Sequence, residues 1–321
     1  MITPRAYSAK PLLLLVLLLS QSAWAQPVGL AVNSRGFLPD DQVHVLWEVD
    51  LATGEVQRIG QTGFIDMEGL ALAPDGTLYG ADDESKTLVT INTETGFSTP
   101  VGGVTRNMGM PVVEPLDFGM TFTCDGELLL VSDYEQTLFV ADLETGELTR
   151  VGQAGGLGAP ITGLAAWGDA LYGIGQGVRG IDGQFSTDSP NLYRIDRENG
   201  TSEWVGPLGD GVRQYANAGL AFDADGGLWA LTDRRENGVP DIASEILAID
   251  PETGAAEKIA DSELVGFESL AISTPGGCET GVEGTAPQRA RPIPAAGTLS
   301  LATLILLILA VSGWTLSTRQ R

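Results

Sequence analysis

A five-residue turn motif occurs five times along the chain and constrains its fold more than any other feature. Each copy begins with Asp or Asn and ends with Gly, and the copies lie at residues 50–54, 92–96, 142–146, 196–200 and 250–254. An aliphatic residue stands four positions before each copy, and another stands five positions after each Gly. The Asp or Asn side chain can accept hydrogen bonds from the backbone two residues on, and Gly tolerates the positive φ of a tight turn. The motif therefore predicts five β-hairpins.

A second repeat precedes four of these hairpins and completes a unit of four short strands. It begins with Gly, contains an Asp-bearing turn, and lies at residues 69–79, 119–129, 163–172 and 219–229. The glycines that end the turn motif are 42, 50, 54 and 54 residues apart, which is the period of propeller blades. Four tryptophans fall in or beside these strands, and we expect them to pack between blades: Trp47, Trp167, Trp204 and Trp229.

The two ends of the repeat region each supply part of one further blade. Residues 267–273 resemble the first strand of the second repeat, and residues 28–33 resemble its second strand. Joining both ends in one blade leaves the ring without an open edge. We therefore predict an all-β fold, a five-bladed β-propeller of four-stranded blades in which residues 264–273 and 28–60 form the shared blade. A six-bladed ring is the alternative.

The chain ends carry segments that lie outside this ring. Residues 1–25 combine a basic start, an apolar run and a small-x-small site, which predicts a signal peptide, so the propeller occupies residues 26–273 of an exported protein. Residues 274–296 are rich in Pro and Gly and predict a flexible tether. Residues 297–316 carry no charge and are long enough for one transmembrane helix, and the basic residues 317–321 would stay cytoplasmic.

This tail resembles the PEP-CTERM class of bacterial sorting signals, in the variety with an Ile-Pro-Thr-Leu-Ser motif. Ile293-Pro294 and Thr298-Leu299-Ser300 carry the resemblance, although residues 295–297 interrupt the motif. The resemblance implies that an exosortase-type membrane enzyme cleaves the tail and transfers the protein to the bacterial cell envelope. A permanent single-span anchor is the alternative. The blades resemble those of exported bacterial propeller proteins, several families of which have no assigned function, so they imply a fold and no reaction.

The charge of the chain limits its partners. All 42 acidic residues but only 12 of the 18 basic residues lie within residues 26–288, which gives this part a net charge of −30. Such a charge excludes nucleic acid as a partner. It attracts divalent cations or simply keeps the surface solvated. His44 is the single histidine, which disfavours hydrolytic triads and excludes metal sites with several histidines.

Loops alternate between the two faces of a propeller. The Asp-bearing turns, the five hairpin turns and both chain ends share one face, and there we predict a disulfide between Cys124 and Cys278 that fastens the ring closure. Two independent thiols are the alternative. The other, outward face carries the acidic loops that differ most between blades, at residues 33–41, 81–86, 103–115, 173–190 and 233–244. Variable loops on one face commonly bind ligands, although ordinary solvated loops have the same composition.

Polar residues recur where the first strand of each blade enters the ring axis: Glu68, Asp117, Thr162, Asn217 and Glu268. Their offset from the strand glycines differs between blades, so a β-bulge would be needed for all of them to point inward. The three carboxylates, Glu68, Asp117 and Glu268, would repel one another at the channel mouth. A hard cation such as Ca²⁺ would relieve that repulsion, and we expect no other cofactor. A water-filled mouth with raised carboxylate pKa values is the alternative.

Three functions are compatible with these features. The first is a non-catalytic propeller, displayed on the cell envelope, that binds a polysaccharide, a surface protein or a cation through its outward acidic face. The second is a secreted glycoside hydrolase or lyase that uses axial carboxylates. The third is a structural component of a matrix or biofilm. No residue is assigned a catalytic role.

Overall fold

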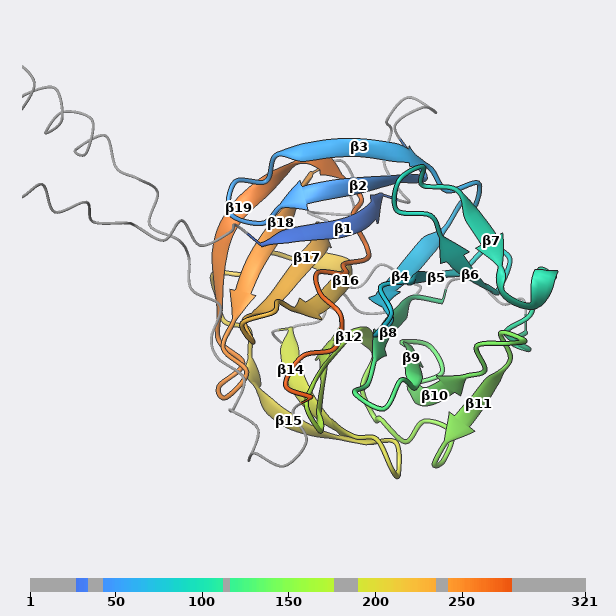
Figure 1. Cartoon of the computed structure of the whole chain (residues 1–321). Helices are drawn as coiled ribbons and strands as arrows, with labels where there is room; N and C mark the ends of the chain where they lie inside the picture. The colour runs from blue at the N-terminus through green and yellow to red at the C-terminus, as the bar shows by residue number, and fades with distance from the viewer. Residues whose placement is uncertain (1–26, 34–42, 112–115, 176–189, 235–241, 279–321) are drawn as a thin grey trace, which may run out of the picture.

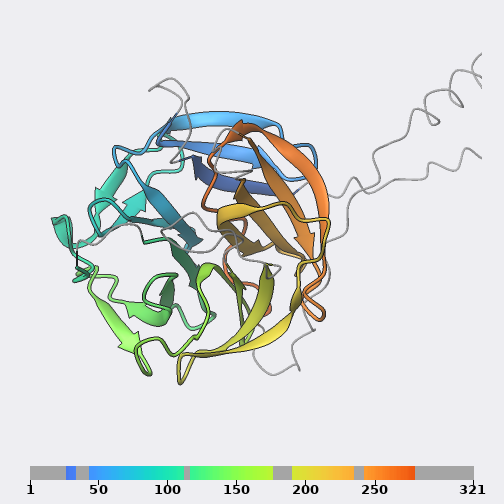
Figure 2. The same ribbon diagram turned by 180° about the vertical axis from the view of Figure 1, so that it is seen from behind.

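The computed structural model of the 321-residue chain describes residues 27–33, 43–111, 116–175, 190–234 and 242–278. These residues form a ring of five antiparallel blades around a central axis, seen from its two sides in Figure 1 and Figure 2. The predicted five-bladed all-β propeller is confirmed. The predicted signal peptide and the apolar segment 297–316 lie outside the described residues. Within the described ranges, no helix is long and apolar enough to cross a bilayer.

Four blades are continuous stretches of chain, and in each the first strand lies at the axis and the fourth at the rim. One short 3₁₀ turn, η1 (Val101–Gly103), follows the first of these blades. The strands of the four blades are β4 (Met67–Leu72), β5 (Leu78–Asp82), β6 (Thr87–Ile91) and β7 (Ser98–Pro100); β8 (Phe118–Phe122), β9 (Leu128–Ser132), β10 (Thr137–Ala141) and β11 (Leu148–Val151); β12 (Ile161–Trp167), β13 (Ala170–Gly175), β14 (Asn191–Asp196) and β15 (Thr201–Pro207); and β16 (Tyr215–Phe222), β17 (Leu228–Arg234), β18 (Ala243–Ile249) and β19 (Ala256–Val265).

The fifth blade joins the two ends of the described chain, as predicted. Its outer strands are β1 (Val28–Asn33), β2 (Val45–Asp50) and β3 (Val56–Gln61). Residues 267–271, which we call the closing segment, run along β1 through two isolated bridges, Leu30–Ala271 and Asn33–Phe267. The segment 264–273 that was predicted for this blade is thus not one continuous strand: its first two residues end β19, and Gly266, at φ 74°, turns the chain towards the axis.

The repeated turn motif closes a hairpin in every blade and also packs against the neighbouring blade. In the copy at residues 142–146, the Asp142 carboxylate accepts hydrogen bonds from the N–H groups of Glu144 and Thr145 at 2.8 and 2.9 Å. The glycines that end the five copies have φ between 67° and 87°. A Cβ atom on Gly60, in β3, would overlap the carbonyl oxygen of Thr95 in the next blade's turn. The motif therefore holds strands within a blade and blades within the ring.

The hydrophobic core consists of five clusters, and each cluster lies between two neighbouring blades. Trp47, Trp167 and Trp229 are buried in these clusters, as expected. The expectation was wrong for Trp204, which is 59% exposed. It stands on β15, the rim strand of its blade, where side chains near the outer edge are not covered by a neighbouring sheet.

The predicted disulfide is present on the face that carries the Asp-bearing turns. Cys124, in the turn after β8, is bonded to Cys278, which lies 154 positions later in the sequence, and their Cα atoms are 5.3 Å apart. The chain that leads to Cys278 crosses this face: Ser273 Oγ donates to Phe222 O at 2.9 Å, and Gly276 O accepts from Gly168 N at 2.9 Å. The disulfide therefore ties the C-terminal end of the ring to a different blade.

Candidate functional site

Local irregularities in three innermost strands place predicted polar residues at the ring axis. The strand register shifts around Glu68 in β4, around Thr162 in β12 and around Asn217 in β16. A bulge of this kind leaves one residue outside the ladder and redirects its side chain. The strand β8 is regular and begins only at Phe118, directly after Asp117. Three of the five blades thus use the bulge that sequence analysis required.

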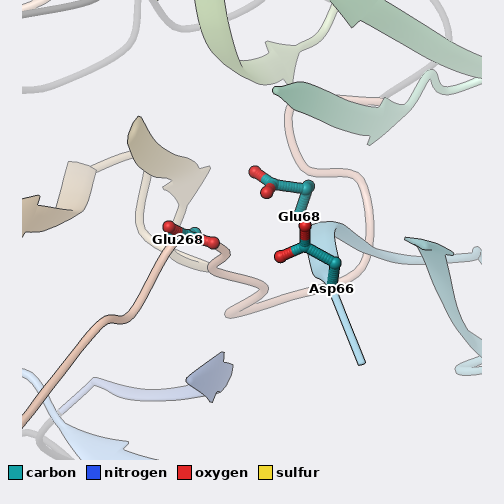
Figure 3. Close-up of side chains that lie close together, drawn as sticks. All are labelled: Asp66, Glu68 and Glu268. Carbon is teal, nitrogen blue, oxygen red and sulfur yellow. The ribbon is translucent and has the colours of Figure 1, made fainter. Parts of the chain in front are cut away.

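Three carboxylates converge at the mouth of the axis, and we call them the mouth cluster: Asp66, Glu68 and Glu268 (Figure 3). One carboxylate oxygen can be chosen from each residue so that the three oxygens all lie within 4.8 Å of one another. Glu68 and Glu268 are each only 1% exposed, and Asp66 is half-buried. Glu68 stands on β4, Asp66 directly precedes this strand, and Glu268 lies on the closing segment. The cluster therefore bridges two blades.

Asp66, and not Asp117, is the third member of this group. Sequence analysis had placed Asp117 with Glu68 because both precede a strand glycine. The backbone shows a different correspondence: Asp66 O accepts from Asp83 N at 2.7 Å, and Asp117 O accepts from Asp133 N at 3.1 Å. Asp66 and Asp117 thus occupy matching positions in adjacent blades, and the bulge inserts Glu68 after Asp66. An acidic residue two positions before a bulged glutamate was the signal that sequence analysis missed.

Two neutral side chains border the mouth cluster. The amide of Asn217 donates a hydrogen bond to Glu68, and its own oxygen accepts from Ala218 N at 2.7 Å. Thr162 is fully buried, and its hydroxyl oxygen has no hydrogen-bond partner among the described residues. Thr162 and Glu68 line the same cavity of about 150 Å³ on the axis. A buried hydroxyl of this kind carries an energetic cost that a ligand or a bound water would remove.

The axial channel changes character with depth. The cavity that holds Glu68 and Thr162 shares Leu70, Met120 and Leu220 with a second cavity of about 360 Å³ nearer the disulfide. This second cavity is lined mainly by apolar side chains and by residues 273–276 of the C-terminal segment. Carboxylate, amide and hydroxyl side chains are therefore gathered at one end of the channel, and residues with mostly apolar side chains line the other.

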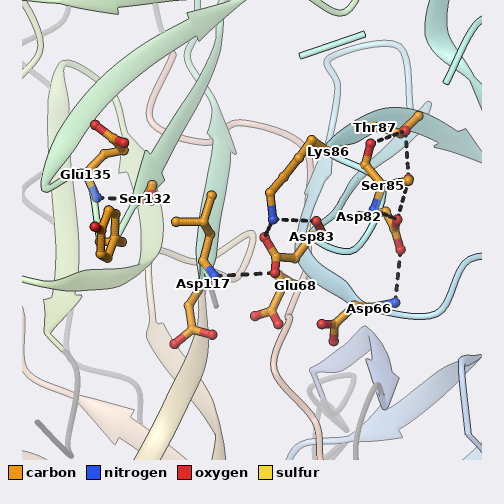
Figure 4. A network of polar contacts seen from close by, with 12 residues as sticks. Asp66, Glu68, Asp82, Asp83, Ser85, Lys86, Thr87, Asp117, Ser132 and Glu135 are labelled. Carbon is orange, nitrogen blue, oxygen red and sulfur yellow. Dashed lines mark hydrogen bonds and ion pairs between the residues drawn. The ribbon is translucent and has the colours of Figure 1, made fainter. Parts of the chain in front are cut away.

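A second polar network supports the backbone around the mouth (Figure 4). Asp83 and Lys86 form an ion pair in which both side chains are 1% exposed. Asp82 accepts hydrogen bonds from Asp66 N at 2.9 Å and from Ser85 N at 2.8 Å. The predicted outward loop 81–86 thus positions the mouth cluster. The other predicted outward loops, at 33–41, 103–115, 173–190 and 233–244, extend into residues outside the described ranges.

Asp133 is the titratable group near the mouth with the clearest shift. Burial, with a smaller contribution from the charge of Asp83, raises the pKa of Asp133 from 3.8 to about 6, against the hydrogen bonds that it accepts from Asp117 N and Tyr134 N. Because the folded-state pKa exceeds the unfolded value, this carboxyl contributes stability below pH ~4 that is lost as the pH rises through ~6.

Comparisons with known proteins assign no family to this chain. No protein-family model matches the sequence, and no curated protein matches it significantly. One similar solved structure is a gluconolactonase from Xanthomonas campestris, with 12% sequence identity, a TM-score of 0.42, and coverage of 69% of this chain and 73% of that one. Another is virginiamycin B lyase from Staphylococcus aureus, with 14% identity, a TM-score of 0.38, and coverage of 73% of this chain and 69% of that one. A third is TolB from Acinetobacter baumannii, with 14% identity, a TM-score of 0.41, and coverage of 74% of this chain and 53% of that one. At these values the likeness supports no functional argument.

Proposed function

We propose that this protein is an exported, non-catalytic propeller that binds Ca²⁺ in the mouth of its axial channel. The observation that carries the proposal is the convergence of three carboxylates, two of them almost fully buried, on one point of the axis. Like charges at this spacing destabilise one another unless a proton or a cation compensates them. A divalent cation would neutralise two of the three charges at once.

The donor atoms favour a hard cation over a transition metal. The mouth cluster offers carboxylate oxygens, and Thr162 adds a buried hydroxyl beside Glu68. Both cysteines are joined in the disulfide, and the single histidine, His44, is not in the cluster. Ca²⁺ accepts six to eight oxygen ligands in flexible geometry, whereas Mg²⁺ demands a near-ideal octahedron and keeps its waters. Protein oxygens on separate blades suit the more tolerant ion.

The burial of the mouth cluster favours ion binding over glycoside hydrolysis. Two carboxyl groups of the cluster are about as close as the ~5 Å separation found in retaining glycosidases. However, Glu68 and Glu268 are each only 1% exposed, and a sugar must reach both catalytic carboxyl groups in order to react. An ion fits between such groups, whereas a sugar ring would have to displace the strands that carry them.

We further propose that the propeller is displayed on the cell envelope through its C-terminal tail. The apolar segment 297–316 with its terminal Arg residues supports this placement. An extracellular polysaccharide or a surface protein would then bind on the mouth face, and the ion would stiffen that surface. Fractionation of cells that produce the chain with and without residues 297–321 tests the placement, and equal release of both forms would contradict it.

Calcium titration of the full chain, purified in detergent, tests the ion site. We expect Ca²⁺ up to ~5 mM to raise the melting temperature and to give a saturable calorimetric isotherm, in the affinity range of extracellular calcium modules. Glu268→Gln should abolish both responses. The same variant should melt at or above the temperature of the calcium-free wild type, because it removes one of three repelling charges.

Glu94→Gln is the matched control, since it removes one negative charge from an exposed hairpin turn far from the mouth. It should respond to Ca²⁺ as the wild type does. An unchanged melting temperature and no heat of binding in the wild type would contradict the proposal. So would an equal response in the Glu268→Gln variant.

A further inference from the structure

The closing segment is held to the ring by few backbone contacts. It pairs with β1 through two isolated bridges, whereas β1 pairs with β2 over six consecutive residues. One further hydrogen bond comes from Val32 N to Ser269 Oγ, at 3.1 Å, and thus uses a side chain in place of a backbone acceptor. Closure of the ring therefore depends strongly on the interactions made at the two ends of the closing segment.

Glu268 connects the near end of this segment to the mouth cluster. It is 1% exposed and lies beside Phe267, whose N–H donates to Ser244 Oγ at 3.1 Å. The other two carboxylates, Asp66 and Glu68, belong to the adjacent blade (Figure 3). An ion shared by all three would join the closing segment to that blade. The buried hydroxyl of Thr162, which lines one cavity with Glu68, provides a further oxygen on the Glu68 side.

The disulfide fastens the far end of the same stretch. Cys278 lies ten residues after Glu268 and is bonded to Cys124 on a third blade. Between them, Gly276 pairs with Trp167 and lies so close to its ring that a Cβ atom there would overlap it. The stretch 268–278 thus runs from the mouth, along the axis, to the opposite face. The disulfide fixes its far end to another blade, and its near end lies beside two carboxylates of the adjacent blade.

We propose that the cation site and the disulfide are coupled fasteners of the ring closure, so that each strengthens the other. This inference rests on the proposed calcium function. With the disulfide intact, the closing segment is already ordered and Glu268 stays at the mouth, so the ion does not have to order it. Without the disulfide, binding of the ion must itself order the closing segment. The apparent calcium affinity then equals the intrinsic affinity multiplied by the fraction of chains in which the segment is already closed.

Linkage requires the effect to be reciprocal. If the disulfide raises calcium affinity by a given factor, then Ca²⁺ shifts the equilibrium between the dithiol and the disulfide towards the disulfide by the same factor. Couplings between sites in proteins commonly amount to ~5–150-fold. We therefore expect at least a five-fold weaker calcium affinity in the chain that lacks the disulfide, and a thiol–disulfide equilibrium that Ca²⁺ shifts towards the disulfide by the same factor.

Calorimetry on the full chain in detergent tests the first expectation, using the wild type and the Cys124→Ser/Cys278→Ser double variant. Five-fold or greater weakening supports the coupling. Equal affinities in both forms overturn it and leave the calcium site standing. Absence of binding in both forms overturns the calcium site itself, and the coupling with it.

The second expectation needs no folded double variant. The fraction of the wild-type disulfide that is reduced at equilibrium in a dithiothreitol redox buffer is measured with 5 mM Ca²⁺, with 5 mM Mg²⁺ and with chelator. We expect Ca²⁺ to shift this equilibrium at least five-fold towards the disulfide and to increase hydrogen-exchange protection of the Ala271 and Val32 amides. In Glu268→Gln, Ca²⁺ should leave the equilibrium unchanged. A wild-type equilibrium that Ca²⁺ does not shift, in a protein shown to bind it, contradicts the coupling.

Discussion

Replacement of Gly119 by alanine tests how closely the innermost strands approach one another. Gly119 lies on β8, and its φ is outside the left-handed region, so alanine meets no backbone strain of its own. An added Cβ atom would lie 2.6 Å from Gly163 Cα and 2.7 Å from Thr162 O, both on β12 of the next blade. These are backbone atoms, and a change of rotamer cannot move them away.

The magnitude follows from that geometry. Carbon atoms in ordinary contact are ~3.5–4 Å apart, so β8 and β12 would have to separate by about 1 Å. Overpacking of this kind costs about 1–3 kcal/mol. For a domain of this size, each kcal/mol lowers the melting temperature by about 2–4 °C. We expect Gly119→Ala to lower it by about 2–12 °C, and to weaken calcium binding because Thr162 moves with β12.

Differential scanning calorimetry of the two alanine variants provides the measurement. Gly211→Ala is the control, because no atom lies within 4 Å of the position of its added Cβ. It should be neutral or slightly stabilising, since alanine restricts the unfolded chain. If Gly119→Ala melts within 1 °C of the Gly211→Ala variant, then the innermost strands are not packed as tightly as the closed ring requires.

Two further predictions concern other parts of the ring. Asp133→Asn keeps the oxygen that accepts from Asp117 N but removes the buried negative charge. In chemical denaturation this variant should be more stable than the wild type by up to about 3 kcal/mol at pH 8 and equally stable at pH 4. A stability difference that does not change with pH would contradict this prediction. Trp229→Phe should lower the free energy of unfolding by about 1–3 kcal/mol, because Trp229 is 2% exposed and donates to Asp223 at 2.8 Å, whereas Trp204→Phe at the exposed rim should change it by about 0.5 kcal/mol or less. Equal effects of the two tryptophan substitutions would contradict the placement of Trp229 in the core and of Trp204 at the exposed rim.

Much of the architecture was predictable because it depends on local chemistry that repeats. An Asp or Asn that accepts backbone hydrogen bonds and a Gly at positive φ mark each hairpin without reference to the rest of the chain. Five such marks set the number of blades. The incomplete repeats at the two ends then identified the shared blade, and loop alternation placed Cys124 and Cys278 on one face, where the disulfide forms.

The composition of the candidate site was decided only by the tertiary structure. Whether Glu68 points to the axis depends on a bulge, which is a property of the register between β4 and β5 and not of either strand alone. That bulge places Glu68 beside Asp66 and Glu268, while the regular strand β8 has no equivalent and Asp117 stays outside the cluster. Cavity size and the exposure of Trp204 likewise follow from how blades pack. Hydrogen bonds between neighbouring residues are encoded locally, whereas register and packing are set by contacts between residues far apart in the chain.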